Sequence, residues 1–246
     1  VSFVVKLLPQ RNPQPILAGV LIEAGDDGLS LAAFDYEASA RTRIEATVDE
    51  PGTILVHGRL LSEIASRLPN APIQITQDAD GEILLTCGSA RFTLAAMPVA
   101  EYPAIPEVSG DSGLVPGDDF STAIAQVAFA ASRDDVTPVL TGVQLEVTGN
   151  ELSLVATDRY RVALREINFD SGAVAREEAT TALVPARTLT EVGKTFAHSG
   201  DIQISFSGSG DREIIAFTAG NKTVTSLLIK GNFPPVRRLF PAQTEH

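Results

Sequence analysis

An internal repeat constrains the fold of this chain more than any other feature of its sequence. Residues 15–40 align with residues 138–163 without a gap, and 11 of the 26 paired positions are identical. The alignment continues downstream at a slightly larger offset, where residues 56–64 pair with residues 184–192. We therefore expect the 246 residues to fold as two similar domains.

The boundary between the two copies is predicted from composition. Residues 106–119 are rich in proline, glycine and aspartate, as linkers are. We place the first domain at residues 1–108 and the second at residues 109–246. The second copy opens with a strand and helix pattern near residue 113 that has no full counterpart in the first copy. The first domain is accordingly expected to lack its opening strand and part of its first helix.

Strand patterns dominate both copies. Short alternating segments rich in β-branched residues are separated by Gly-Asp and Asp-Gly steps, which predicts antiparallel strands joined by hairpins. Two helices per copy are also predicted, and in the second copy Asp118 or Asp119 is expected to cap the first of them. The helix predicted at residues 59–68 is expected to bury Leu60, Leu61, Ile64 and Leu68. The predicted fold class is α+β, with tandem copies of an antiparallel-sheet domain carrying two helices on one face.

A catalytic or metal-binding constellation is not evident in the sequence. The three histidines have no metal-ligand spacing, and the single cysteine, Cys87, lies in a strand pattern that predicts burial. Asp35 and Asp158 are equivalent in the repeat, which favours a structural role in accepting backbone hydrogen bonds at a turn. The alternative is a hydrolase that uses Asp158 as a general base. We expect no catalytic residue, no metal and no cofactor.

The charge of the chain bears on nucleic-acid binding. A net charge of −12 argues against holding nucleic acid by bulk electrostatics. Corresponding helices nevertheless carry arginine at corresponding positions, Arg59 and Arg187. These residues belong either to a solvated face or to a weak phosphate-facing surface. The candidates for such a surface are Arg11, Arg59, Arg67, Arg133, Arg187 and Lys194.

Two long motifs resemble the bacterial DNA polymerase III beta sliding clamp family, in wording close to its actinobacterial branch. They are VATDRYRVA at residues 155–163 and IKGNFPPVRRLFP at residues 229–241. The resemblance extends over essentially the whole chain. Clamps of this family have three such domains, and two chains form a homodimeric ring around duplex DNA. The resemblance thus implies the DNA clamp fold, with a third clamp domain absent from this chain.

The function implied by this resemblance is binding rather than catalysis. A sliding clamp is the non-catalytic processivity subunit of a DNA-directed DNA polymerase, and it encircles DNA without sequence specificity. The implied partners are the replicative polymerase alpha subunit, the clamp loader, repair polymerases and ligase. Each inserts a short peptide with a glutamine and two bulky apolar residues. No membrane segment or signal peptide is recognisable, so a cytoplasmic location is expected.

The family's peptide pocket maps onto the second domain. The matching positions are Leu140, Thr157, Arg159, Tyr160, Arg161, Val162, Pro234, Arg238 and Leu239. The apolar members would receive anchor side chains, and Thr157, Arg161 and Arg238 would hold polar groups of the peptide. Arg159 departs from the family, because many relatives have glycine there. The family also completes this pocket with residues of the third domain.

The repeat also separates shared from unshared residues. Arg161, Arg237 and Arg238 have no basic counterpart in the first copy, which makes them candidates for binding. An alternative for the whole chain is the two-domain trimeric clamp of archaea and eukaryotes, proliferating cell nuclear antigen, whose length it would suit. The two motifs and the shortened first repeat argue against it.

Overall fold

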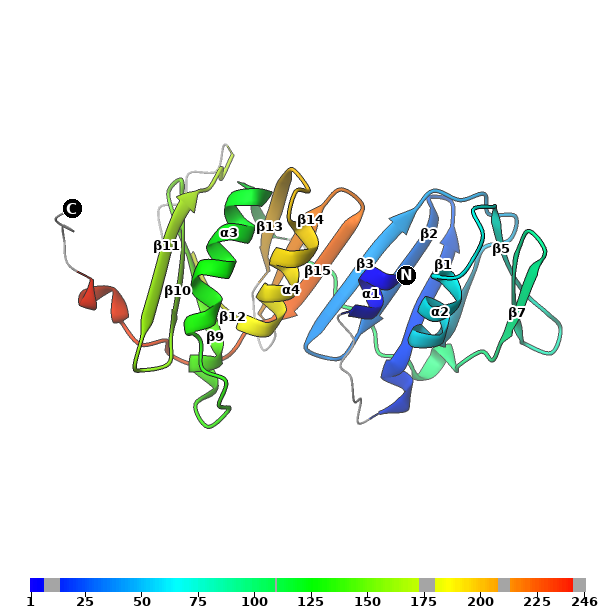
Figure 1. The fold of residues 1–246 in the computed structure, drawn as a ribbon, viewed down its shortest axis with the longest axis horizontal. Helices are drawn as coiled ribbons and strands as arrows, with labels where there is room; N and C mark the ends of the chain where they lie inside the picture. The colour runs from blue at the N-terminus through cyan, green and yellow to red at the C-terminus, as the bar shows by residue number, and fades with distance from the viewer. Residues whose placement is uncertain (7–13, 109, 173–179, 208–212, 241–246) are drawn as a thin grey trace. The chain divides into compact units, whose positions relative to one another are not determined.

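Both copies of the repeat fold into similar successions of elements. The computed structural model describes residues 1–6, 14–108, 110–172, 180–207 and 213–240. It divides into a first unit, Val1–Glu107 with Asn221–Val224, and a second unit, Val108–Gly220 with Thr225–His246. Figure 1 shows antiparallel strands and a few helices in each unit. These observations confirm the predicted α+β class.

The first unit begins with helical segments and continues mainly as strands. Its elements are α1 (Ser2–Lys6), η1 (Pro15–Ala18), β1 (Gly19–Gly25), β2 (Gly28–Phe34), β3 (Ala38–Ile44), β4 (Gly52–His57), α2 (Gly58–Ala65), β5 (Ile73–Gln77), β6 (Ile83–Cys87), β7 (Ala90–Leu94) and η2 (Val99–Glu101). Strands β4-β1-β2-β3 are neighbours in that order, and β5-β6-β7 form a separate sheet. Cys87 is buried, as its strand pattern predicted.

The second unit contains the longer helices. Its elements are β8 (Asp111–Pro116), α3 (Gly117–Val127), η3 (Ala128–Ala130), η4 (Pro138–Thr141), β9 (Gly142–Thr148), β10 (Glu151–Thr157), β11 (Val162–Asn168), β12 (Thr180–Pro185), α4 (Ala186–Phe196), β13 (Asp201–Ser207), β14 (Ile214–Ala219), η5 (Val236–Leu239) and, from Thr225 on, β15 (Lys222–Leu227). Strands β11-β10-β9-β12 form one sheet, and β15-β14-β13-β8 are neighbours on the other side of the unit.

Strand register repeats along with the sequence. In the first unit Gly19 of β1 pairs with His57 of β4, and in the second Gly142 of β9 pairs with Pro185 of β12. In each pair the glycine begins its strand, β1 or β9, directly after a one-turn 3-10 helix. The two copies therefore share their strand pairing in detail as well as their order of elements.

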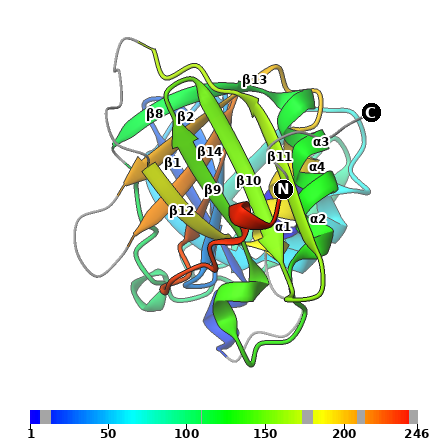
Figure 2. The same ribbon diagram turned by 90° about the vertical axis from the view of Figure 1, so that its left-hand side faces the viewer.

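Helices α3 and α4 lie side by side against the strands of the second unit (Figures 1 and 2). Their apolar faces explain this position, because Phe120, Ile124 and Val127 of α3 are buried. In α4 the buried positions include Leu189 and Phe196. The helices bury these side chains within the core of the unit.

Two details of the helices differ from the sequence predictions. The residue that precedes α3 as its N-cap is Pro116, and Asp118 and Asp119 lie in the first turn instead of capping it. Their negative charges there still stabilise the helix by interacting with the positive end of its dipole. In α2, Leu60 is 44% exposed while Leu61 is buried. Adjacent residues point about 100° apart around a helix, and here packing buries Leu61 and leaves Leu60 half exposed.

Candidate functional site

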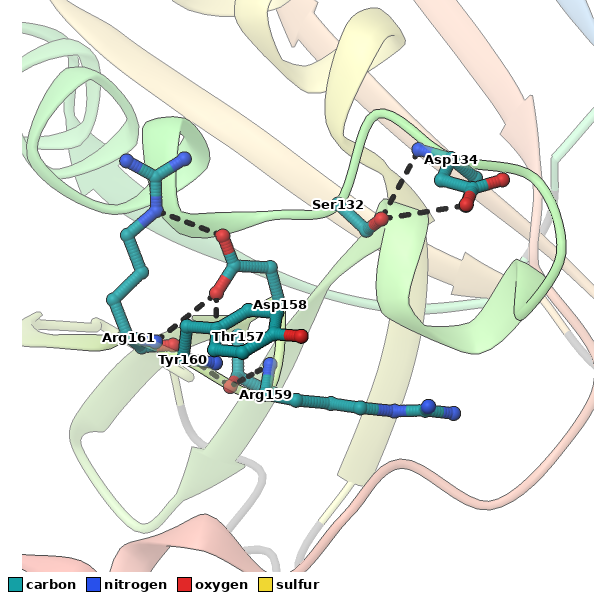
Figure 3. Close-up of polar contacts among 7 residues, drawn as sticks. All are labelled: Ser132, Asp134, Thr157, Asp158, Arg159, Tyr160 and Arg161. Carbon is teal, nitrogen blue, oxygen red and sulfur yellow. Dashed lines mark hydrogen bonds and ion pairs between the residues drawn. The ribbon is translucent and has the colours of Figure 1, made fainter.

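The site residues predicted in the second unit centre on the turn between β10 and β11. Asp158 holds this turn: its Oδ1 accepts hydrogen bonds from the backbone N–H groups of Tyr160, at 3.1 Å, and Arg161, at 3.0 Å (Figure 3). The Thr157 hydroxyl donates to the Arg161 carbonyl at 2.8 Å and accepts from the Arg159 N–H at 3.2 Å. Thus every residue of the turn is fixed by a local hydrogen bond.

The first unit makes the same turn with different side chains. Asp35 Oδ1 accepts hydrogen bonds from the N–H groups of Glu37, at 3.0 Å, and Ala38, at 2.8 Å. The residue after each aspartate has a positive φ, 74° at Tyr36 and 79° at Arg159. The prediction that the repeated aspartates are structural is therefore confirmed.

The hydrolase alternative is wrong for Asp158. Partial desolvation would raise the pKa of this carboxyl, but the N–H groups of Arg161 and Tyr160 and the Arg161 charge outweigh it and lower the pKa below its ordinary value. A carboxylate that already accepts several hydrogen bonds is a weak general base. Across the described part of the chain, no three histidine, cysteine or carboxylate side chains gather as metal ligands.

The turn presents three large side chains at its surface. Tyr160 is 96% exposed, and the Arg159 guanidinium donates to the Thr137 hydroxyl at 3.0 Å. Arg161 is held twice: its Nε lies 2.9 Å from Asp158 Oδ2, and its guanidinium lies over the Phe129 ring, 5.4 Å from the centroid. Arg161 is thus oriented before any ligand arrives.

Phe129 is a residue that the sequence reasoning missed. It lies in η3, outside the recognised motifs, and its side chain is 58% exposed. An exposed phenylalanine beside two apolar alanines gives no sequence signal of function. Only its contact with Arg161 connects it to the turn.

The remaining predicted pocket residues differ in burial. Leu140 and Thr157 are buried, Val162 and Pro234 are half-buried, and Leu239 is 72% exposed. The loop before Leu140 is tied in place, because the Leu140 carbonyl accepts a hydrogen bond from Ser132 N–H at 2.7 Å. Pro234, Arg238 and Leu239 belong to the C-terminal segment, and among the described residues no hydrogen bond or ion pair joins them to the turn.

In the first unit the residue equivalent to Thr157 belongs to a buried aromatic cluster. Phe34, the counterpart of Thr157, forms a buried apolar cluster with Leu55 and Tyr102. The Phe34 N–H donates to the Tyr102 hydroxyl oxygen at 2.8 Å, and this hydroxyl donates to the Gly19 carbonyl at 3.3 Å. The first unit thus has a buried aromatic cluster at the position where the second unit has the smaller, buried Thr157.

The predicted DNA-facing residues are exposed where the structure describes them. Arg59 and Arg187 are each the second residue of a helix, α2 and α4, and Lys194 of α4 pairs with Glu191 at 2.9 Å. The helix predicted at residues 59–68 ends at Ala65, so Arg67 lies in the segment after it, and Arg133 lies in the segment after η3. Arg11 lies outside the described residues.

Comparison with known proteins covers both copies. The model of the DNA polymerase III beta subunit N-terminal domain matches residues 1–106, and that of the central domain matches residues 114–235. A beta sliding clamp of Streptomyces coelicolor is 44% identical over 99% of this chain and 64% of its own length. One of Micrococcus luteus is 44% identical over 98% of this chain and 76% of its own length.

Solved structures give the same result for the fold. The DNA polymerase sliding clamp of Bacillus subtilis superposes with a TM-score of 0.88 at 30% identity, over 98% of this chain and 64% of that one. The chain thus spans less than two thirds of the length of these two longer relatives. All these matches are to the bacterial clamps, so the trimeric two-domain alternative is wrong. By family models, sequence and fold, the chain belongs to the DNA polymerase III beta subunit family, the bacterial beta sliding clamps.

Proposed function

We propose that the chain forms the first two domains of a three-domain clamp that encircles duplex DNA as a homodimer. In this role it confers processivity on the replicative polymerase and performs no chemistry itself. The family matches over both units support this proposal, since they place the chain with the sliding clamps over almost its whole length.

The observation that carries the partner-binding part of the proposal is the rigid, exposed turn at residues 157–161. It presents Tyr160 and Arg161, two side-chain types that dominate binding energy in interfaces. Their backbone is fixed by Asp158, so little conformational entropy is lost when a ligand binds. We propose that peptides of the polymerase alpha subunit, clamp loader, repair polymerases and ligase bind here.

The DNA part of the proposal depends on weak rather than tight contacts. A ring retains DNA by topology, and strong phosphate contacts would oppose sliding. Arg59 and Arg187 recur at equivalent helix positions in an otherwise acidic chain. We propose that these two, with the other described basic residues Arg67, Arg133 and Lys194, face the duplex.

A direct binding measurement tests the peptide site. The probe is a fluorescent peptide with a glutamine and two bulky apolar residues, followed by anisotropy on the 246-residue chain. We expect Arg161→Ala and Leu140→Ala to weaken binding at least about fivefold, because each removes a contact worth roughly 1 kcal/mol.

The repeat supplies the matched control. Tyr36→Ala alters the corresponding turn of the first unit and should leave the affinity unchanged. Thermal unfolding followed by circular dichroism shows whether each variant is folded. Unchanged affinity in both second-unit variants, with folding intact, would rule out this site.

A further inference from the structure

Two neighbouring arginines of η5 have different surroundings. The Arg237 Nη1 lies 3.2 Å from Glu166 Oε1, its Nε lies 3.7 Å from Glu146 Oε2, and its Nη2 donates a hydrogen bond to the Ser153 hydroxyl. Arg238 is exposed and makes no hydrogen bond or ion pair with any residue that the structure describes. The sequence alone does not distinguish these adjacent arginines.

The three partners of Arg237 form a row across the sheet. Glu146 of β9 pairs with Ser153 of β10, and Ser153 pairs with Glu166 of β11. Residues in register on neighbouring strands place their side chains on the same face. The planar guanidinium, with donors at several angles, can meet all three at once, which a lysine ammonium cannot do as well.

The row carries two like charges that a cation must balance. Glu146 and Glu166 are separated by one strand, about 10 Å, and lie on the same face of the sheet. Arg237 lies between them, with its side chain 45% exposed. Partial shielding makes this arrangement stronger than an ordinary surface ion pair, since two carboxylates and a hydroxyl share one guanidinium.

The first unit shows what the row looks like without such a residue. There the equivalent residues are Glu23, Ser30 and Arg43, in the same register across β1, β2 and β3. An arginine on the third strand supplies a cation within the row itself. In the second unit this position is Glu166, and the cation comes instead from the C-terminal segment.

We propose that Arg237 is a positioning residue, which fastens the Val236–Leu239 segment to the outer face of β9, β10 and β11. By holding the segment there, it keeps Arg238 and Leu239, two of the predicted pocket residues, on the strands β10 and β11 that flank the peptide-binding turn. This last step rests on the proposed function. The fastening itself depends only on the contacts of Arg237.

The first measurement follows the segment in the absence of any ligand. Hydrogen exchange of the 246-residue chain reports the N–H groups of Val236 and Phe240, which bond to the carbonyls of Pro234 and Arg237. We expect Arg237→Gln to accelerate their exchange at least fivefold, and Arg238→Gln, the matched control on the adjacent residue, to leave it unchanged. Equal exchange in the two variants would overturn the proposal.

A charge exchange tests whether the ion pair is the cause. Arg237→Glu should loosen the segment, and adding Glu166→Arg should restore its protection. The strand tolerates arginine at this position in the first unit, where Arg43 occupies it. If the double variant exchanges as fast as Arg237→Glu alone, the pair does not hold the segment.

The second measurement connects the segment to binding of the same fluorescent peptide. Arg237→Gln should weaken it three- to tenfold, and the charge-exchanged double variant should recover most of the loss. A loosened segment with unchanged affinity would overturn the positioning role. If the unmodified chain binds no peptide, the proposed function fails and the positioning role fails with it, while hydrogen exchange still decides whether Arg237 fastens the segment.

Discussion

At the scale of single residues, the backbone at Arg159 is under strain. Its φ of 79° lies in the left-handed region, where a Cβ atom costs about 1 kcal/mol or more. Glycine adopts such a φ without that cost. The Arg159–Thr137 hydrogen bond is exposed and offsets only part of the strain.

Arg159→Gly is therefore expected to raise the free energy of unfolding by up to about 1 kcal/mol. Denaturant unfolding measures this change. Arg159→Ala is the matched control, because it removes the same hydrogen bond but keeps the Cβ. If the glycine variant is no more stable than the alanine variant, the turn is not strained by its Cβ.

Sequence reasoning predicted the role of the turn aspartates but not the contacts between distant segments. Asp35 and Asp158 could be assigned because the repeat places them at equivalent strand ends, and their hydrogen bonds are local. The contact of Phe129 with Arg161 and the docking of Arg237 on Glu146 depend on tertiary structure. No local pattern in the sequence specifies which distant strands a side chain will meet.

At the scale of elements, glycines allow two strands to begin close to their neighbours. A Cβ on Gly19 would lie 2.6 Å from a Leu55 side-chain carbon, and one on Gly142 would lie 2.7 Å from the equivalent carbon of Leu183. The same close approach recurs in both units. It is a property of the repeated fold rather than of either copy.

Gly142→Ala is expected to destabilise the chain by about 1–3 kcal/mol, because the added methyl group must displace packed side chains. Gly25→Ala is the control: this glycine also lies in a strand, its φ is not positive, and a Cβ there would meet nothing within 4 Å. Urea unfolding of both variants checks the difference. Equal stabilities would show that the strand start can relax.

The buried hydroxyl of Tyr102 makes the stability of the first unit sensitive to alkali. Burial raises the pKa of Tyr102 to about 12; the Phe34 N–H opposes this shift, and the nearby Asp35 charge adds to it. Between pH 10 and 12 the unfolded chain loses a proton that the folded chain keeps, so stability decreases as pH rises.

The expected loss from this tyrosine is about 2–3 kcal/mol across that interval, since two pKa units separate the folded and unfolded values. Tyr102→Phe should be less stable at neutral pH, because it leaves the Phe34 N–H without its hydroxyl acceptor. The Tyr102→Phe variant should also lack the decrease in the free energy of unfolding that ionisation of Tyr102 causes between pH 10 and 12. Urea unfolding at several pH values distinguishes the two proteins, and parallel pH profiles would contradict the assignment.

The order of the elements was more predictable than which residues each helix buries and where each helix begins. Hairpin turns and alternating strands follow from local chemistry, and both copies confirmed them. The choice between Leu60 and Leu61 and the position of the α3 N-cap depend on how each helix meets its sheet. Tertiary packing settles these details, and a helical period read from one sequence leaves them open.

At the scale of the whole molecule, a net charge of −12 limits how strongly the chain can hold DNA by charge alone. At about 150 mM salt we expect no measurable binding to a short linear duplex in an anisotropy assay, because exposed charges are screened beyond roughly 8 Å. At low salt weak binding should emerge. Arg59→Glu with Arg187→Glu should abolish it.

Reversal of charge at a basic residue outside the proposed surface is the control for that measurement. Arg91 of β7 serves, since it is exposed and lies in the sheet β5-β6-β7. If Arg91→Glu reduces binding as much as the double variant does, the effect reflects net charge. The helix arginines would then have no special part in it.

The paired aspartate turns have a consequence for how such a protein can change. Each turn is built from one carboxylate and backbone groups, with a left-handed residue after the aspartate. In the second unit the Thr157 hydroxyl adds two hydrogen bonds to the turn, whereas the exposed side chain of Tyr160 makes none of them and can be replaced without rebuilding the loop. In the first copy a buried phenylalanine precedes the aspartate, while the second copy presents two arginines and a tyrosine at its turn. Selection could thus explore new recognition in one copy of a scaffold whose architecture was already secured by both.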